Sequence, residues 1–134
     1  MQMTRIICGF AGIGKSTVAR NNTGFVDLES TPFEKDWDRY VKVAEHIANN
    51  GYIVLLSCHK ELREKLRSKN IDYLLVIPKK DQKAEYLQRY KNRGNTENFI
   101  NLLDSNWKSF LSILPNEKVL IVGNYLNKEF LKNW

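Results

Sequence analysis

Short apolar runs rich in branched residues alternate along the chain with longer charged segments whose apolar positions recur at helical spacing. Five strands are predicted from the apolar runs, at residues 5–8, 25–28, 52–56, 73–77 and 118–122. Helices are predicted from the periodic segments, at residues 14–20, 37–49, 60–68, 82–92, 97–114 and 127–133. Strands that are apolar throughout, joined by helix-length segments, indicate a parallel sheet with helices on both faces. The pattern therefore predicts an α/β fold of three layers with a five-stranded parallel sheet.

The segment at residues 97–114 carries the longest periodic pattern. Asn95-Thr96-Glu97 offers an N-cap for it, directly after Gly94. Its apolar side chains recur at helical spacing, and we expect them to pack into the core rather than to line a ligand groove. They are Leu102, Leu103, Trp107, Phe110, Leu111 and Leu114.

The chain length of 134 residues is that of one domain. We therefore treat residues 1–134 as a single domain. Its apolar runs are all shorter than a membrane span, and its first residues lack the apolar core and cleavage site of a signal peptide. A cytoplasmic protein without a membrane partner is expected.

The two cysteines, Cys8 and Cys58, each follow or lie within an apolar run. Such thiols are typical of small core residues in a reducing compartment. A zinc site is not expected, because the sequence contains no CxxC pair and only two histidines, His46 and His59.

The net charge is +6, from 21 basic and 15 acidic residues. This excess indicates anionic partners, which are either phosphorylated small molecules or nucleic acid. Charge alone does not choose between them. We find no basic stripe interleaved with aromatic residues, so a nucleic-acid partner is not expected.

Residues 9–16 read GFAGIGKS and match the pattern GxxxxGK[ST] between a predicted strand and a predicted helix. A phosphate group must be met by several backbone N–H groups at once, and side chains at Gly12 and Gly14 would obstruct that approach. The N–H groups at the start of the following helix add to the anion site. The sequence thus predicts a P-loop that binds a nucleoside triphosphate.

The roles of the P-loop residues follow from the motif. Lys15 is expected to reach the β- and γ-phosphates, and the Ser16 hydroxyl suits a Mg²⁺ ion. The expected cofactors are ATP and Mg²⁺. We assign nucleotide binding to six consecutive residues, Gly12, Ile13, Gly14, Lys15, Ser16 and Thr17.

Two further segments resemble small P-loop kinases of the shikimate and gluconate kinase group. They are residues 23–30, TGFVDLES, and residues 52–63, YIVLLSCHKELR. The resemblance implies that Asp27 lies near the metal and that Glu29 meets the acceptor. Standard P-loop ATPases and adenylate kinases carry an aspartate where this chain has Ser57 at the end of the third strand. This departure leaves Asp27 as the expected metal carboxylate.

Residues 86–94, YLQRYKNRG, resemble the lid of small kinases, and we expect the lid at about residues 80–95. Arg89 and Arg93 are four residues apart and lie on one face of a helix. On a closing flap, their guanidinium groups would neutralise the transferred phosphoryl group and exclude water. The resemblance extends over nearly the whole chain, and similar patterns occur in P-loop kinase-like proteins of bacteriophages of Gram-positive hosts.

Candidate acceptor residues follow the second and third predicted strands, because ligands in open α/β sheets bind at the carboxyl ends of the strands. His59, Lys60 and Arg63 would form a cationic wall for a phosphate or carboxylate. Ser30 and Thr31 either bind the acceptor or cap the next helix. After the last strand, Gly123 and Asn124 either approach the adenine base, as the resemblance implies, or form an ordinary turn.

These features lead to one preferred function and two alternatives. The preferred function is a Mg²⁺-dependent ATP phosphotransferase acting on a small anionic acceptor, which we expect to be a nucleoside monophosphate. The first alternative is a kinase of the gluconate or shikimate type for a hydroxyl acceptor, with Glu29 as general base. The second is a non-catalytic nucleotide-binding module that acts on a partner. The sequence is compatible with a monomer or a homodimer.

Overall fold

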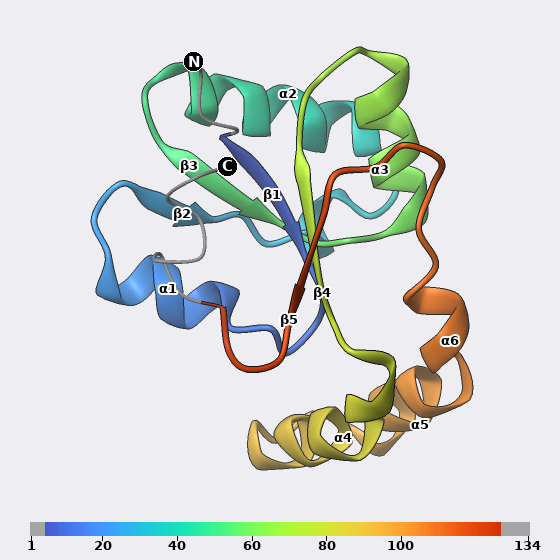
Figure 1. Ribbon diagram of the computed structural model, residues 1–134. Helices are drawn as coiled ribbons and strands as arrows, with labels where there is room; N and C mark the ends of the chain where they lie inside the picture. Colours follow the sequence, from blue (N-terminus) through green and yellow to red (C-terminus); the bar gives the residue numbers. More distant parts are fainter. Residues whose placement is uncertain (1–4, 127–134) are drawn as a thin grey trace.

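The computed structural model describes residues 5–126, which form a five-stranded sheet flanked by helices (Figure 1). Neighbouring strands are parallel, and their order across the sheet is β2-β3-β1-β4-β5. The strands are β1 (Ile6–Gly9), β2 (Phe25–Asp27), β3 (Ile53–Leu56), β4 (Leu74–Pro78) and β5 (Val119–Val122). The five predicted strands are confirmed, and their ends shift by about one residue.

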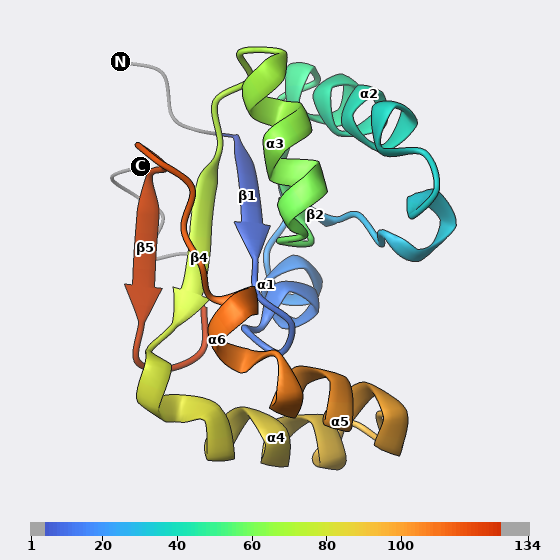
Figure 2. The same ribbon diagram turned by 90° about the vertical axis from the view of Figure 1, so that its right-hand side faces the viewer.

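The helices pack on both sides of this sheet. In Figures 1 and 2, α1 and α3 lie on opposite faces of the strands, and α2 packs against β3 and α3. This arrangement is consistent with the predicted three-layer α/β fold. The helices are α1 (Lys15–Asn21), α2 (Trp37–Asn49), α3 (Lys60–Ser68), α4 (Lys83–Asn92), α5 (Glu97–Ser105) and α6 (Trp107–Phe110), with 3₁₀ turns η1 (Thr31–Phe33) and η2 (Lys80–Gln82).

One end of the sheet is covered by the last described helices. The arrowheads of β1, β4 and β5 in Figure 2 point toward α4 and α5, which cross below the carboxyl ends of the strands. Because all the strands are parallel, the loops that follow them meet at this edge. The P-loop, the end of β2 and the start of α4 are thereby brought to the same edge of the sheet.

The prediction of a single helix over residues 97–114 is wrong. Helix α5 ends at Ser105, and a separate short helix, α6, follows Asn106. Both the backbone N–H and the side-chain Nδ2 of Asn106 donate to the carbonyl oxygen of Leu102, at 3.2 and 2.8 Å. Such local bonding by asparagine competes with the helical ladder and bends the chain. The predicted cap is confirmed, since Thr96 Oγ1 accepts a hydrogen bond from the Phe99 amide at 3.2 Å.

The apolar stripe of this region is only partly core. Leu103, Trp107 and Leu111 are buried, whereas Leu102 and Phe110 are 51% and 38% exposed. The stripe is thus divided between α5 and α6, and part of it faces solvent. Leu114 is half-buried. The helix predicted at residues 127–133 lies outside the described residues.

The three central strands of the sheet form the centre of the hydrophobic core. Every residue of β1, β3 and β4 is buried, while the edge strands β2 and β5 are partly exposed. Cys8 is fully buried in β1 and Cys58 is half-buried, and both thiols are free. Burial raises the pKa of both thiols, so they stay protonated at neutral pH. Both cysteines are core residues, as the sequence predicts.

Helix length and composition also bear on membrane insertion. Between Arg5 and Leu126, no helix combines the length and the apolar character that a bilayer crossing requires.

Candidate functional site

The loop between β1 and α1 has the backbone conformation that its glycines allow. Gly12 and Gly14 have φ angles of 85° and 111°, in the region that side chains disfavour. A Cβ atom at Gly12 would also lie 2.8 Å from the ring of Tyr90. The first helical hydrogen bond runs from the Val18 N–H to the Gly14 carbonyl, at 3.0 Å. The amides of residues 15–17 therefore have no acceptor within α1.

The side chains of the loop divide into core and surface. Ile13 is fully buried and anchors the loop, while Ser16 and Thr17 are exposed at the start of α1. Thr17 Oγ1 accepts a hydrogen bond from Arg20, at 3.4 Å. The exposed Ser16 hydroxyl is thus accessible to a ligand, in agreement with the role that the motif predicts for it.

The Lys15 ammonium folds back over the loop that precedes it. Its Nζ donates to the carbonyl oxygens of Gly9 and Phe10, at 2.6 and 3.4 Å. Burial lowers the pKa of Lys15, and the positive charge of Arg93 lowers it further, whereas the negative charge of Asp27 opposes the shift. Lys15, Asp27 and Arg93 therefore share one electrostatic environment, although they come from three different elements.

The opposite side of the loop is held by three hydrogen bonds to three consecutive carbonyl groups. The Tyr90 hydroxyl donates to Ala11, at 2.8 Å, and Arg89 Nη1 donates to Gly12, at 2.9 Å. The Leu126 amide donates to Ile13, also at 2.8 Å. Helix α4 and the residues after β5 thus contact the same turn of the P-loop from outside.

The two arginines of the predicted lid make different contacts and differ in exposure. The Arg89 guanidinium lies between the rings of Tyr86 and Tyr125, 4.2 and 3.8 Å from their centroids, and its side chain is 6% exposed. Its Nη2 also forms an ion pair with Glu85, at 3.0 Å. Arg93 is exposed and donates to Asn95 Oδ1, at 3.0 and 3.1 Å. Arg89 thus binds the P-loop backbone, and the predicted action of both guanidinium groups on the transferred phosphoryl group stays a prediction.

The end of β2 contributes the predicted carboxylates. Asp27 is half-buried, and burial raises its pKa; Lys15 opposes this rise and Glu29 adds to it. Glu29 is exposed and accepts a weak hydrogen bond from Thr31, at 3.4 Å. Ser30 is 8% exposed, and its carbonyl oxygen starts η1 by accepting from Phe33, at 2.8 Å. Asp27 thus ends β2 and Glu29 follows it, while Ser30 is largely closed off from solvent; the metal and acceptor roles of the two carboxylates stay predictions.

The predicted cationic wall is only partly present. Lys60 is exposed at the start of α3. His59 is also exposed, its Nδ1 lies 2.9 Å from Ser57 Oγ, and its ring lies 5.1 Å from that of Trp37. The Tyr40 hydroxyl, close to these residues, donates a hydrogen bond to the Leu28 carbonyl at 2.6 Å. His59 and Lys60 therefore remain candidates for acceptor binding.

Arg63 is not available to an acceptor. Its Nη1 donates to both carboxylate oxygens of Glu117, at 2.7 and 2.9 Å, and its Nε donates to Cys58, at 3.0 Å. The side chains of the pair are 3% and 0% exposed. A charge that is buried and paired in this way supports the fold. We therefore correct the prediction that Arg63 binds the acceptor.

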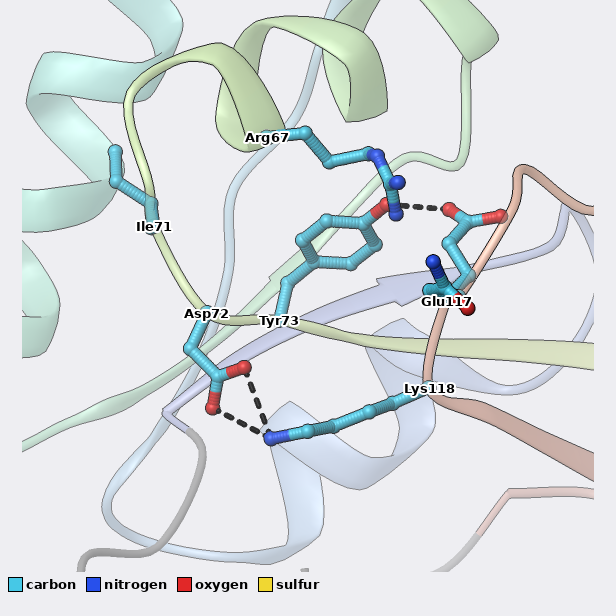
Figure 3. Close-up of a pocket in the computed structure, with 7 residues that line it drawn as sticks. Arg67, Ile71, Asp72, Tyr73, Glu117 and Lys118 are labelled. Carbon is cyan, nitrogen blue, oxygen red and sulfur yellow. Dashed lines mark hydrogen bonds and ion pairs between the residues drawn. The ribbon is translucent and has the colours of Figure 1, made fainter.

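Glu117 belongs to a polar cluster at the amino ends of β4 and β5, at the opposite edge of the sheet from the P-loop. Figure 3 shows the Tyr73 hydroxyl directed at the Glu117 carboxylate and Lys118 directed at Asp72. Glu117 also accepts from the Leu114 amide, at 2.6 Å. A pocket of about 140 Å³ lies beside this cluster. The cluster is a structural feature that the sequence does not reveal, because its members are far apart along the chain.

The loop after β5 meets the start of α4. Gln82 Nε2 donates to the Gly123 carbonyl, at 3.0 Å, and Gln82 Oε1 accepts from the Lys79 amide, at 2.8 Å. Asn124 Oδ1 accepts from the Tyr125 amide, at 2.8 Å. Gly123 and Asn124 are exposed near the P-loop, as required for the predicted approach to a base. Gln82 is a residue that sequence reasoning missed, because Lys79 lacks the side-chain oxygen of an N-cap residue and the segment carries no capping-box pattern.

The donor set can be tested for its fit to Mg²⁺. This ion takes one or two protein oxygens together with phosphate oxygens and water. Ser16 and Asp27 supply such a set near Lys15, and in residues 5–126 no group of three His, Cys, Asp or Glu side chains forms a separate metal site. The residues present therefore fit Mg²⁺ bound chiefly through a nucleotide.

Comparisons of the chain with known protein families, curated proteins and solved structures found no match.

Proposed function

We propose that the protein is a small P-loop kinase that transfers the γ-phosphoryl group of ATP to a nucleoside monophosphate in the presence of Mg²⁺. The observation that carries this proposal is the form of the loop at residues 9–16. Two glycines have positive φ, three successive carbonyls are hydrogen-bonded on one side, and Lys15 and Asp27 share one environment. This combination suits a polyphosphate better than it suits a glycine-rich turn that only caps a helix.

The residues around the loop supply the chemistry of phosphoryl transfer. An oxygen of the acceptor phosphate attacks the γ-phosphorus, and the bond from that phosphorus to the bridging oxygen breaks, which releases ADP. Lys15 exchanges its contacts with two carbonyl oxygens for the β- and γ-phosphates. Arg93 is exposed at the end of α4, the helix that contacts the P-loop, and in this proposal it approaches the transferred group. Mg²⁺, held by Ser16 and near Asp27, neutralises charge on the phosphates when it is bound.

The acceptor lies at the carboxyl ends of β2 and β3 in this proposal. Glu29, His59 and Lys60 are exposed there, and Lys60 supplies a positive charge for the acceptor phosphate. The half-buried ring of Trp37 lies beside His59 and offers an aromatic surface next to these polar groups. A nucleoside monophosphate combines an aromatic base with a phosphate and matches this surface better than a sugar acid does.

The test is a panel of acceptors. Purified protein is incubated with ATP, Mg²⁺ and nucleoside monophosphates, nucleosides or sugar acids, and formation of ADP is followed. We expect acceptor-dependent ADP formation with a nucleoside monophosphate and none with the Lys15→Ala variant. Phosphorylation of a sugar acid would instead assign Glu29 as a general base. If no acceptor stimulates ADP formation although ATP binds, the kinase proposal fails and the non-catalytic module remains.

A further inference from the structure

Three consecutive peptide groups of the P-loop are fixed from outside. The carbonyl oxygens of Ala11, Gly12 and Ile13 each accept one hydrogen bond, at 2.8, 2.9 and 2.8 Å. The donors come from the Tyr90 hydroxyl, the Arg89 guanidinium and the Leu126 amide. Two of these donors belong to α4, which is about 80 residues further along the chain; Tyr90 and Ala11 are 79 residues apart.

The direction of a carbonyl group sets the direction of the next amide. In a trans peptide, the C=O of one residue and the N–H of the following residue point to opposite sides. The described chain contains no cis peptide bond. Bonds to Ala11 and Ile13 from outside therefore turn the amides of Gly12 and Gly14 toward the other side of the loop. The amide between them, that of Ile13, donates to Phe10 at 3.0 Å and closes the turn.

Arg89 is suited to a fixed contact rather than to a moving one. The rings of Tyr86 and Tyr125 both contact its guanidinium group, and Glu85 pairs with Nη2. Moving it toward a phosphoryl group would break the bond to Gly12, the ion pair and both ring contacts together. The Tyr90 ring likewise fills the space that a side chain at residue 12 would need. Helix α4 is thus attached to the P-loop through both residues.

We propose that Tyr90 and Arg89 are positioning residues, which act through the P-loop backbone. The Tyr90 bond to Ala11 holds the Gly12 amide in the direction that a polyphosphate requires, and the Arg89 bond to Gly12 holds the neighbouring Ile13 amide in the turn. This inference rests on the proposed function. It differs from the role of a lid arginine, because the contribution is present in the ground state. Loss of either contact should weaken the binding of phosphate groups before any transfer occurs.

The test compares two tyrosine-to-phenylalanine variants. Tyr90→Phe removes the hydroxyl bond to the P-loop and keeps the ring. Tyr40→Phe removes part-buried bonds of the same kind, the one that its hydroxyl donates to the Leu28 carbonyl and the weaker one that it accepts from the Ser57 amide, and does not touch the P-loop. The probes are inorganic tripolyphosphate and ATP with Mg²⁺, measured by calorimetry, and the thermal stability of each variant is recorded. Tripolyphosphate has no base, so its affinity reports on the phosphate site alone.

We expect Tyr90→Phe to lower the affinity for both probes by about three- to tenfold, which is the value of one hydrogen bond. Tyr40→Phe should lose a similar amount of stability and leave both affinities unchanged. Arg89→Lys should weaken tripolyphosphate as well, because lysine keeps the charge but loses the planar group. Unchanged tripolyphosphate affinity in Tyr90→Phe, with wild-type binding that depends on Lys15, would overturn the positioning role alone. So would an Arg89→Lys variant that loses kcat and keeps its affinity. Absence of binding of either probe to the wild type would overturn the proposed function and this inference together.

Discussion

The buried pair of Arg63 and Glu117 allows a prediction whose size follows from the structure. In the Arg63→Met variant, the Glu117 carboxylate keeps its bonds from Tyr73 and Leu114 but loses the guanidinium group that donates to both of its oxygens. Removing one partner of a buried ion pair costs about 3–5 kcal/mol. A domain of this size has an unfolding free energy of about 5–15 kcal/mol, so about a fifth or more of the stability would be lost.

The measurement is equilibrium unfolding in urea, followed by tryptophan fluorescence, without nucleotide. The corresponding fall in the thermal midpoint is roughly 10–20 °C. A matched control is Arg67→Met, one turn further along α3. Arg67 donates a hydrogen bond to the Pro115 carbonyl, and the loss of this bond should cost only about 1 kcal/mol of stability. Adding Glu117→Gln to Arg63→Met should restore part of the loss, because it removes the uncompensated charge and keeps an acceptor for Leu114.

Two results would refute this reasoning. One is a stability for Arg63→Met within about 1 kcal/mol of the wild type, since the pair would then contribute no more than a surface ion pair does. The other is a stable Arg63→Met protein with a raised acceptor KM, which would return Arg63 to the acceptor site.

Three further predictions concern the chemistry of the site. Lys15→Ala should abolish ATP turnover, at a cost of several kcal/mol in the transition state, and steady-state ADP formation by the folded variant would contradict the P-loop assignment. Arg93→Ala should lower kcat at least tenfold, about 1.4 kcal/mol, with a much smaller change in ATP affinity by calorimetry; full kcat would make Arg93 a solvated residue. Asp27→Asn should raise the Mg²⁺ concentration needed for half-maximal activity, and an unchanged Mg²⁺ titration would move the metal carboxylate to Glu29. Burial raises the pKa of Asp27, so its stabilising contribution is present below the unfolded-state pKa and is lost as pH rises through the folded-state pKa. The thermal midpoint of Asp27→Asn, relative to that of the wild type, should therefore rise between about pH 3 and about pH 7.

Local pattern in the sequence was sufficient to place the elements and the P-loop. A strand buried on both faces must be apolar throughout, and an amphipathic helix must repeat its apolar positions every three to four residues. Both signals are carried by neighbouring residues. The glycines and the lysine of residues 9–16 are likewise adjacent, so a glycine loop between β1 and α1 could be predicted without a fold. The same holds for Thr96, whose capping bond reaches only three residues.

Contacts between distant residues were decided by the tertiary structure. Arg63 and Glu117 are 54 residues apart, and Arg89 and Gly12 are 77 apart, so no local pattern indicates that either arginine is bound. In the sequence, an arginine that is exposed and free to bind a ligand looks the same as one that is buried in an ion pair. Asn106 shows the converse, because a single side chain bonded to the carbonyl four residues earlier interrupts a pattern that reads as one continuous helix. The strand order alone brings α4 beside the P-loop, because parallel strands gather at one edge the loops that the sequence keeps apart.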